Sequence, residues 1–346
     1  MTSKPFSLRT RLNEFARVEL AHLPTRLEAM PRLQAEIGGP ALWIKRDDAT
    51  GLSTGGNKAR KLEFLLAEAL GQGADCLVTV GATQSNHVRQ TAAAAARAGL
   101  DCFAVLEDRG VSESTAYKSN GNYLLDQLHG AEITRLKPGQ DGKVAMAELV
   151  ERLRGEGRKP YAVPGGGSNP VGSLGYVDCA RELVQQCRDI GIAPREIVVA
   201  SGSAGTQAGL LTGLRALGDR TPVLGIGVRA PRAAQEARVF DLAVATADLL
   251  GCPGCVARDD VVVDDTHIGA GYGLATETGL EAISLFARRE AQLLDPVYSG
   301  KAAAGLIHHC RVGRYASTDH VIFLHSGGTA GLFGYCDLFG GGMGLS

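Results

Sequence analysis

Aromatic side chains, net charge and long hydrophobic runs are all scarce in this 346-residue chain. Aromatic residues make up 5%, and 36 basic side chains oppose 37 acidic ones, which gives a net charge of −1. A nucleic-acid-binding protein would need a basic stripe, and the sequence has none. No apolar run approaches the roughly 18–20 residues that span a bilayer, and residues 1–15 contain no apolar signal core. We therefore expect a cytoplasmic protein with neither a nucleic-acid nor a membrane partner.

Disulfides and metal sites are not expected either. Six of the eight cysteines are scattered along the chain, several within apolar segments, and buried thiols are their expected state. The other two, Cys252 and Cys255, form a Cys-x-x-Cys pair, a spacing found in zinc and redox sites. A structural zinc site needs four ligands, and only His267 stands near this pair. The sequence therefore predicts no metal, and a role for the pair stays open.

Glycine, by contrast, is abundant at 46 residues, and short apolar runs alternate with alanine- and leucine-rich stretches. The apolar runs predict strands at residues 41–45, 76–80, 102–106, 160–163, 197–200, 223–228 and 320–325. The stretches between them predict helices, among them 61–70, 88–98 and 208–217. Buried strands separated by helices indicate the α/β class with open parallel sheets. Ligands of such sheets bind at the carboxyl ends of the strands.

Two glycine-rich stretches mark the expected domain boundaries. One lies at residues 55–57, and the other follows the predicted strand 160–163, at residues 164–167. The sequence therefore predicts a small α/β domain of residues 57–165, inserted into a larger one made of residues 1–56 and 166–346.

A glycine-rich turn at Gly55 and Gly56 brings Asn57 and Lys58 to the start of a predicted helix. Glycines permit backbone angles and close approaches that other residues forbid, so a flat cofactor can lie against such a turn. A lysine held there out of bulk water loses its proton more readily, as an imine-forming lysine must. Taken alone, the same pattern also describes a surface lysine at the end of a loop.

Two further strands lead into polar helix starts. After residues 76–80 come Ser85, Asn86 and His87, whose free N–H groups would favour an anion such as a substrate carboxylate, although the serine could simply cap the helix. After residues 197–200 comes a nest of small residues that suits a phosphate. Its members are Gly202, Ser203, Ala204, Gly205 and Thr206. The nest matches neither a P-loop nor the GxGxxG of a dinucleotide site, so a nicotinamide dehydrogenase is not expected.

Tyrosines and serines occupy three more junctions. Tyr272 lies on a glycine-flanked loop, Tyr298 and Ser299 precede a predicted helix, and Ser326 follows the last strong strand. A tyrosine here suits packing on a planar ring, and a serine suits a ring nitrogen. Together with an imine-forming lysine, a phosphate nest and a carboxylate site, these groups describe pyridoxal 5'-phosphate. Each motif is weak alone, and it is their combination that points to this cofactor.

With these residues in view, the chain resembles the fold-type II pyridoxal phosphate enzymes, related to the tryptophan synthase β-subunit, of the D-cysteine desulfhydrase and 1-aminocyclopropane-1-carboxylate deaminase family. The similarity extends from about residue 23 to residue 333. The motifs that carry it are IKRDD (44–48), GGNKARKLEF (55–64), QSNHVRQTAA (84–93), GSAGTQAG (202–209), GYG (271–273), DPVYSGK (295–301) and HSGG (325–328).

The resemblance implies a role for each matching residue. Lys58 would be the Schiff-base lysine, and the phosphate loop would be residues 202–206. Ser85, Asn86 and His87 would hold the substrate carboxylate, with Asn86 also near the phenolic oxygen of the cofactor. Tyr272 and Tyr298 would lie beside the substrate, and both would be catalytic residues together with Lys58 and Ser85. The resemblance also implies a homodimer.

Two positions favour a carbon–sulfur lyase over a ring-opening deaminase. The deaminases typically carry Glu where this chain has Ser299, and Leu where it has Ser326; hydroxyl partners leave the ring nitrogen largely neutral, which suits a plain β-elimination.

Several segments, including PGGGSNPVGSLGYV (164–177) and LGIGVRAP (224–231), look most like L-cysteate sulfo-lyases. The expected reaction therefore releases sulfite from L-cysteate, giving pyruvate and ammonia, and the alternative is sulfide release from D-cysteine. Arg229 and Arg109 are candidates for holding a sulfonate, although either could equally be a solvated surface charge.

Overall fold

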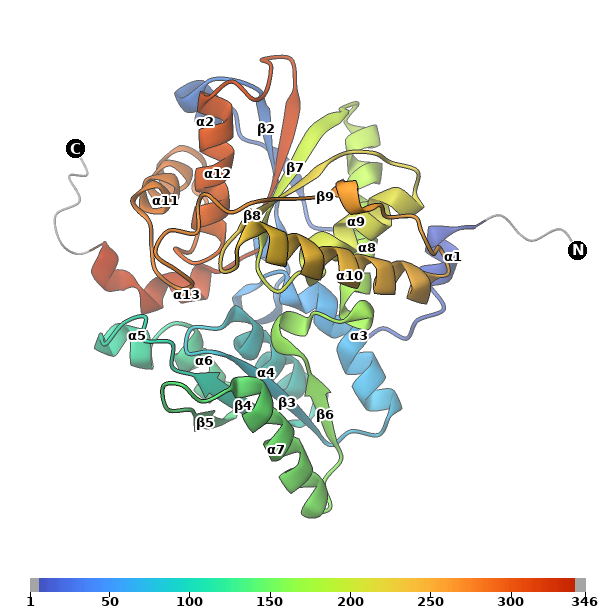
Figure 1. The fold of residues 1–346 in the computed structure, drawn as a ribbon, viewed down its shortest axis with the longest axis vertical. Helices are drawn as coiled ribbons and strands as arrows, with labels where there is room; N and C mark the ends of the chain where they lie inside the picture. The colour runs from blue at the N-terminus through green and yellow to red at the C-terminus, as the bar shows by residue number, and fades with distance from the viewer. Residues whose placement is uncertain (1–5, 340–346) are drawn as a thin grey trace, which may run out of the picture.

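The computed structural model describes residues 6–339, which form two sheets with helices packed around them (Figure 1). The larger sheet has six strands in the spatial order β1, β2, β10, β7, β8 and β9. Their bounds are β1 (Leu27–Ala29), β2 (Ala41–Lys45), β7 (Pro194–Ser201), β8 (Val223–Gly227), β9 (Val261–Asp264) and β10 (His320–Leu324). Strand β1 pairs antiparallel with β2, and the other neighbouring pairs are parallel.

The smaller sheet has four parallel strands in the order β5, β4, β3 and β6. Their bounds are β3 (Cys76–Ala82), β4 (Asp101–Glu107), β5 (Glu132–Arg135) and β6 (Pro160–Val163). In the chain, this whole sheet falls between β2 and β7 of the larger one. The predicted α/β class with two parallel sheets is therefore confirmed. The domain boundaries at residues 57 and 165 stay a prediction, with which this topology is consistent.

Helices cover both faces of the larger sheet, because alternate strand residues point to opposite faces. Val198 and Phe323 belong to a core with helices α2, α11 and α12, whereas Ile197 and Leu324 pack with α8, α9 and α10. The bounds of these helices are α2 (Pro31–Ile37), α8 (Pro170–Asp189), α9 (Gly205–Ala216), α10 (Arg232–Leu250), α11 (Glu277–Glu290) and α12 (Ser299–Arg311).

The smaller sheet is covered in the same way. Leu77 packs with helices α3 and α4 on one face, and Val78 packs with α7 on the other. The remaining helices are α1 (Leu8–Leu12), α3 (Lys58–Gly71), α4 (Asn86–Ala98), α5 (Thr115–Ser119), α6 (Asn122–Leu128), α7 (Gly142–Gly155) and α13 (Thr329–Gly334). Within residues 6–339, no helix combines the length and the apolar character that a membrane span requires.

Helix α3 joins the two halves of the molecule. Phe64 packs against Leu174 and Val177 of α8, beside the larger sheet. Leu62 and Leu65 share a core with the alanine-rich face of α4, beside the smaller sheet. The direction of α3 is therefore set by packing from both sides.

A buried ionic cluster also holds α3 in place. The guanidinium of Arg60 is fully buried, with Nε 2.8 Å from Asp47 Oδ2 and Nη1 3.1 Å from Glu182 Oε2. Glu182 also pairs with the buried ammonium of Lys45. Burial alone would raise the pKa of Asp47, but the charge and hydrogen bonds of Arg60 bring it down to about 2. Asp47 therefore stays ionised, and the cluster ties α3 to the segment after β2 and to α8.

We expect Arg60→Met to lower the free energy of unfolding by about 3–5 kcal/mol, because it leaves buried carboxylates unpaired. Urea denaturation followed by circular dichroism measures this change. The matched control is Arg154→Met, whose ion pair with Glu151 is exposed, and which should cost less than about 1 kcal/mol. Equal stability of the two variants would show that the cluster does not hold α3.

Candidate active site

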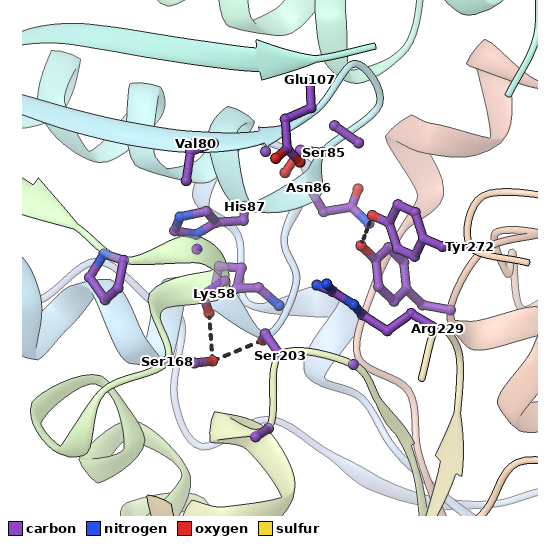
Figure 2. A pocket seen from close by; sticks show the side chains of 18 of the residues that line it. Lys58, Val80, Ser85, Asn86, His87, Glu107, Ser168, Ser203, Arg229 and Tyr272 are labelled. Atoms are coloured by element: carbon purple, nitrogen blue, oxygen red, sulfur yellow. Dashed lines mark hydrogen bonds between the residues drawn. The ribbon is translucent and has the colours of Figure 1, made fainter. Parts of the chain in front are cut away.

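A cavity of about 760 Å³ lies between the two sheets, where the carboxyl ends of strands from both of them meet (Figure 2). Residues at or just after these strand ends line its wall: Ala82, Glu107 and Pro164 from the smaller sheet and Ser201, Arg229 and Ser326 from the larger one. This is the edge at which parallel sheets bind ligands. The volume suits a compact cofactor together with a small substrate.

Lys58 is the first residue of α3 and lies in the cavity wall. Gly55 and Gly56, just before it, have φ angles of 76° and 125°. A Cβ on Gly55 would lie 1.9 Å from the carbonyl oxygen of Asp48, so the turn requires glycine there. The Nζ of Lys58 donates a hydrogen bond to Asn57 Oδ1 at 2.8 Å.

The amine of Lys58 loses its proton more easily than an ordinary lysine. Burial and the positive charge of Arg89 lower its pKa to about 8, against a smaller opposing effect of Asp295. An amine with this pKa is neutral, and therefore nucleophilic, in about half of the molecules at pH 8. This behaviour agrees with the prediction from the glycine-rich turn.

The start of α4 forms another part of the wall. Ser85 is its N-cap, and its Oγ accepts a hydrogen bond from the N–H of Val88 at 3.2 Å, so the capping interpretation is confirmed. Ser85, Asn86 and His87 also line the cavity. The first-turn N–H groups have no carbonyl partner within the helix, and the helix dipole favours an anion beside them. Capping and anion binding are thus compatible in this turn.

His87 offers the cavity a hydrogen-bond acceptor. The hydroxyl of Thr79 donates to the carbonyl oxygen of Val163 at 3.0 Å and lies 2.7 Å from His87 Nε2. Since that hydroxyl proton is used, Nε2 must donate to Thr79. Burial, together with the charges of Lys58 and Lys61, lowers the pKa of His87 well below its usual value, so the ring is neutral. Its buried Nδ1 is then an acceptor without a partner among residues 6–339.

The predicted phosphate loop connects β7 to α9. Ala204 has a φ angle of 78°, a left-handed conformation that is uncommon for a residue with a Cβ. Ser168 supports the loop, since its Oγ donates to Ser203 Oγ at 2.8 Å and accepts from the N–H of Gly205 at 3.2 Å. The residues that line the cavity are Gly202, Ser203, Ala204 and Thr206, and Gly205 is the first residue of α9.

Lys61 is a residue that the sequence analysis missed. Its buried Nζ donates to the carbonyl oxygen of Gly166 and to Ser168 Oγ, both at 3.1 Å. A Cβ on Gly205 would lie 2.9 Å from this Nζ, so the amine adjoins the start of α9. Burial, with a contribution from Lys58, lowers its pKa well below the ordinary value. A buried amine beside the positive end of a helix suits an anion such as phosphate. The available signal was its spacing, three residues after Lys58 and on the same helix face.

Tyr272 and Tyr298 form a pair in the cavity wall. Their hydroxyls are hydrogen-bonded to each other, and their ring centroids lie 5.9 Å apart at an interplanar angle of 72°. The guanidinium carbon of Arg109 lies 4.5 Å from the centroid of the Tyr272 ring. Burial raises the pKa of both phenols, so both are protonated at neutral pH. One hydroxyl proton joins the pair, and the other can be donated to a ligand.

The loop that carries Tyr272 is held by residues outside the predicted site. The Nζ of the buried Lys301 donates to the carbonyl oxygens of Ile268 at 2.6 Å and Gly271 at 2.9 Å. The hydroxyl of Tyr335 donates to the carbonyl oxygen of Gly273 at 3.0 Å. These bonds fix the backbone on both sides of Tyr272.

The two serines that the sequence analysis placed near a ring nitrogen have different surroundings. Ser326 lines the cavity. Ser299 is buried, is not among the lining residues, and donates its hydroxyl to Asp295 Oδ2 at 2.8 Å. Asp295 also accepts from the N–H of Tyr298 at 2.7 Å, so it caps α12. Ser326 therefore has the better-placed hydroxyl, and Asp295 is a buried charge near the site that was missed.

Cys252 and Cys255 follow the end of α10 and do not line the cavity. Their sulfur atoms lie 3.6 Å apart. Within the described part of the chain, no group of three or more His, Cys, Asp or Glu residues is arranged to hold a metal ion.

Comparison with known proteins shows which family the chain belongs to. The chain matches the family described as pyridoxal-phosphate dependent enzymes over residues 18–327, which include every cavity residue named above. The chain belongs to this family. Pyridoxal phosphate, the expected cofactor, is confirmed by this membership.

Individual relatives narrow the family further. The D-cysteine desulfhydrase of Klebsiella pneumoniae is 45% identical over 324 residues, which cover 94% of this chain and 97% of that protein. A solved structure described as an ACC deaminase homologue is 38% identical, with a TM-score of 0.87 and coverage of 97% and 98%. The threonine deaminase of T.th., at 23% identity, a TM-score of 0.64 and coverage of 93% and 96%, shares the fold. The expected subgroup, D-cysteine desulfhydrases and ACC deaminases, is confirmed.

The cavity residues fit pyridoxal phosphate. Lys58 would supply an amine for its aldehyde, and the start of α9, with the buried amine of Lys61 beside it, would supply donors for its phosphate. The Nδ1 of His87, which has no partner within residues 6–339, shows that the wall has unused hydrogen-bonding capacity. A Cβ on Gly166 would lie 2.3 Å from Ser203 Oγ, so glycine keeps the wall beside the phosphate loop open.

The pKa of Lys58 predicts how the cofactor-free protein binds pyridoxal phosphate. Only the neutral amine attacks an aldehyde, so the binding rate should rise with pH up to about 8 and level off above it. Stopped-flow absorbance measured from about pH 6 to 10 tests this. With an ordinary lysine, whose pKa is about 10.4, the binding rate would still be rising at the top of this range. A rate still climbing steeply at the upper end would contradict the assignment.

We expect Lys61→Met to weaken pyridoxal phosphate binding by about 10- to 100-fold, since charged hydrogen bonds contribute about 1.5–3 kcal/mol. Pyridoxal, which lacks the phosphate, should bind the variant and the parent protein equally. Lys143→Met is the control, because Lys143 is an exposed lysine that lines the same cavity. An equal loss of affinity for pyridoxal phosphate and for pyridoxal would show that Lys61 supports the fold of the site and does not bind the phosphate.

Proposed function

We propose that this protein is a carbon–sulfur lyase that removes the sulfur substituent from Cβ of a cysteine-type amino acid. The observation that carries the proposal is the 45% identity, along 94% of the chain, to a protein named D-cysteine desulfhydrase. Pyridoxal phosphate, when bound, accepts the electron pair that deprotonation leaves on Cα. The sulfur then departs from Cβ with its bonding electrons, and hydrolysis of the remainder gives pyruvate and ammonia.

D-cysteine is the first candidate substrate, with sulfide as the leaving group. The sequence motifs favour L-cysteate, but the relatives carry the D-cysteine name. A homodimer and a cytoplasmic location, which the sequence analysis expects, belong to the same proposal.

Lys58 is proposed to move the proton from Cα. Its amine has a pKa of about 8, so the neutral form that accepts a proton is well populated near neutral pH. The first turn of α4, at Ser85, Asn86 and His87, is proposed to orient the substrate by its carboxylate. A substrate held there lies in the same cavity as Lys58.

The tyrosine pair is proposed to serve the departing sulfur. Both phenols are protonated, and their mutual hydrogen bond leaves one proton to donate outward. Donation to the sulfur would stabilise the negative charge that develops as the Cβ–S bond breaks. The proton that Lys58 removes and the proton that a tyrosine lends belong to different atoms, so the two roles do not compete.

Ring-opening deamination is not proposed. Ser326 lines the cavity where the deaminases typically have Leu, and Ser299, where they have Glu, bonds to Asp295. A hydroxyl partner leaves the ring nitrogen largely neutral. β-Replacement, as in cysteine synthases, would need a second nucleophile, so steady pyruvate formation from a single substrate would distinguish it.

L-cysteate is the second candidate substrate, with sulfite as the leaving group. The specific observation in its favour is the presence of Arg229 in the cavity wall, because a neutral thiol needs no guanidinium. Both candidates lose a Cα proton and a sulfur substituent on Cβ, and they differ in the departing group and in the configuration at Cα.

A substrate panel tests the proposed function. Purified holoenzyme should form pyruvate from D-cysteine with sulfide, or from L-cysteate with sulfite, and none from 1-aminocyclopropane-1-carboxylate. Lys58→Ala should reduce turnover at least about 10²-fold, the lower range for a positioned base, and should abolish covalent retention of the cofactor. Lys143→Ala, an exposed lysine of the cavity rim, is the control. Pyruvate from neither sulfur substrate would refute the lyase proposal.

A further inference from the structure

Arg229 presents a positive charge to the cavity. It follows β8, between the buried residues Val228 and Ala230, while its own side chain is exposed. Figure 2 shows its guanidinium pointing into the cavity, which it lines together with Lys58. It makes no hydrogen bond or ion pair with any side chain or carbonyl of residues 6–339. The guanidinium is therefore available to a ligand.

Arg109, the other candidate, is already engaged. Its guanidinium donates twice to Glu107 Oε2, once at 3.0 Å from Nε and once from Nη2. It also stacks over the ring of Tyr272 at 4.5 Å. An ion pair and a stacked ring satisfy this charge within the protein, so Arg109 serves to position Tyr272.

The anions of the cofactor and of the substrate backbone already have other sites. The phosphate is assigned to the start of α9 beside the amine of Lys61, and the α-carboxylate is assigned to the start of α4. Arg229 belongs to neither site. Figure 2 shows Arg229 beside Tyr272, and both residues line the cavity together with Tyr298. The guanidinium of Arg229 therefore faces the region proposed for the departing group.

We propose that Arg229 recognises a second anionic group, borne on Cβ of the substrate. This inference rests on the proposed lyase function and names its substrate class: α-amino acids with an acidic sulfur substituent, a sulfonate above all. The planar fork of a guanidinium matches two oxygens of a sulfonate in a bidentate contact. A thiol offers no such acceptor pair.

The reaction balances without an oxidant or a reductant. The Cα proton passes to Lys58, the Cβ–S bond breaks, and both of its electrons leave with the sulfur as sulfite. One water hydrolyses the remainder to pyruvate and ammonia. Arg229 stays beside the sulfonate oxygens while the negative charge of the departing group increases, so its attraction grows along the reaction.

Kinetics of the holoenzyme and of Arg229→Gln test the inference. We expect kcat/KM for L-cysteate, followed by sulfite release, to fall about 100-fold, the effect of losing charged hydrogen bonds. For D-cysteine, followed by sulfide release, the change should stay below about threefold. Arg229→Lys, which keeps the charge but not the fork, should recover part of the loss. The visible absorbance of the bound cofactor checks that each variant is folded and loaded.

Arg109→Gln is the comparison variant. Because Arg109 acts through Tyr272, its loss should slow both substrates by a similar factor. A wild-type enzyme that releases sulfide from D-cysteine, but neither turns over nor is inhibited by L-cysteate, would overturn the inference and leave the lyase proposal intact. The inference would also be overturned if Arg229→Gln lowered kcat/KM equally for L-cysteate and D-cysteine, or changed it for neither. Pyruvate from neither substrate would instead defeat the lyase proposal itself.

Discussion

The ionic anchor of Arg60 is the constraint on which the rest of the site depends. Lys58 and Lys61 lie three residues apart on one face of α3, and Arg60 lies about 200° around the helix from Lys58. Its buried pairs with Asp47 and Glu182 hold the far side of α3 against α8. Because that side cannot rotate, Lys58 faces the cavity and Lys61 faces the start of α9. One helix thus places an amine in the cavity wall and a second amine beside the predicted phosphate loop.

The cleft offers anions hydrogen-bond donors at several points. The first turns of α4 and α9 bring unpaired N–H groups, and Lys58 and Lys61 add amines whose pKa values are lowered by burial. Protonating these buried amines costs free energy, and the nearby helix N-termini add to that cost. A bound anion would offset it, which is consistent with a phosphorylated cofactor and with the carboxylate site predicted at the start of α4. Affinity for anions and a reactive lysine therefore have one physical origin.

Sequence reasoning found those features that depend on local chain geometry. All seven predicted strands exist, and Lys58, Ser85 and Ser203 line one cavity, because a strand end followed by glycine or a cap is a local signal. Strands β1, β5 and β9 were missed, since each is a three- or four-residue edge strand without a long apolar run. Lys61 and the bond of Ser299 to Asp295 were missed because burial and side-chain direction arise only when distant segments pack.

The contrast between local motifs and contacts of distant segments also explains why family membership identifies the cofactor more readily than the substrate. Cofactor contacts come from glycine-rich turns and helix starts, whose motifs are easily read in a sequence. The groups proposed to surround the departing sulfur lie on three loops, after β8, before α11 and before α12, and the role of each depends on the side chains that it contacts in the folded protein. Arg109 and Arg229 look alike in the sequence, yet one is neutralised by Glu107 and the other has no ionic partner within residues 6–339. Charge pairing in three dimensions, and not residue type, therefore separates a structural arginine from one that can select a substrate.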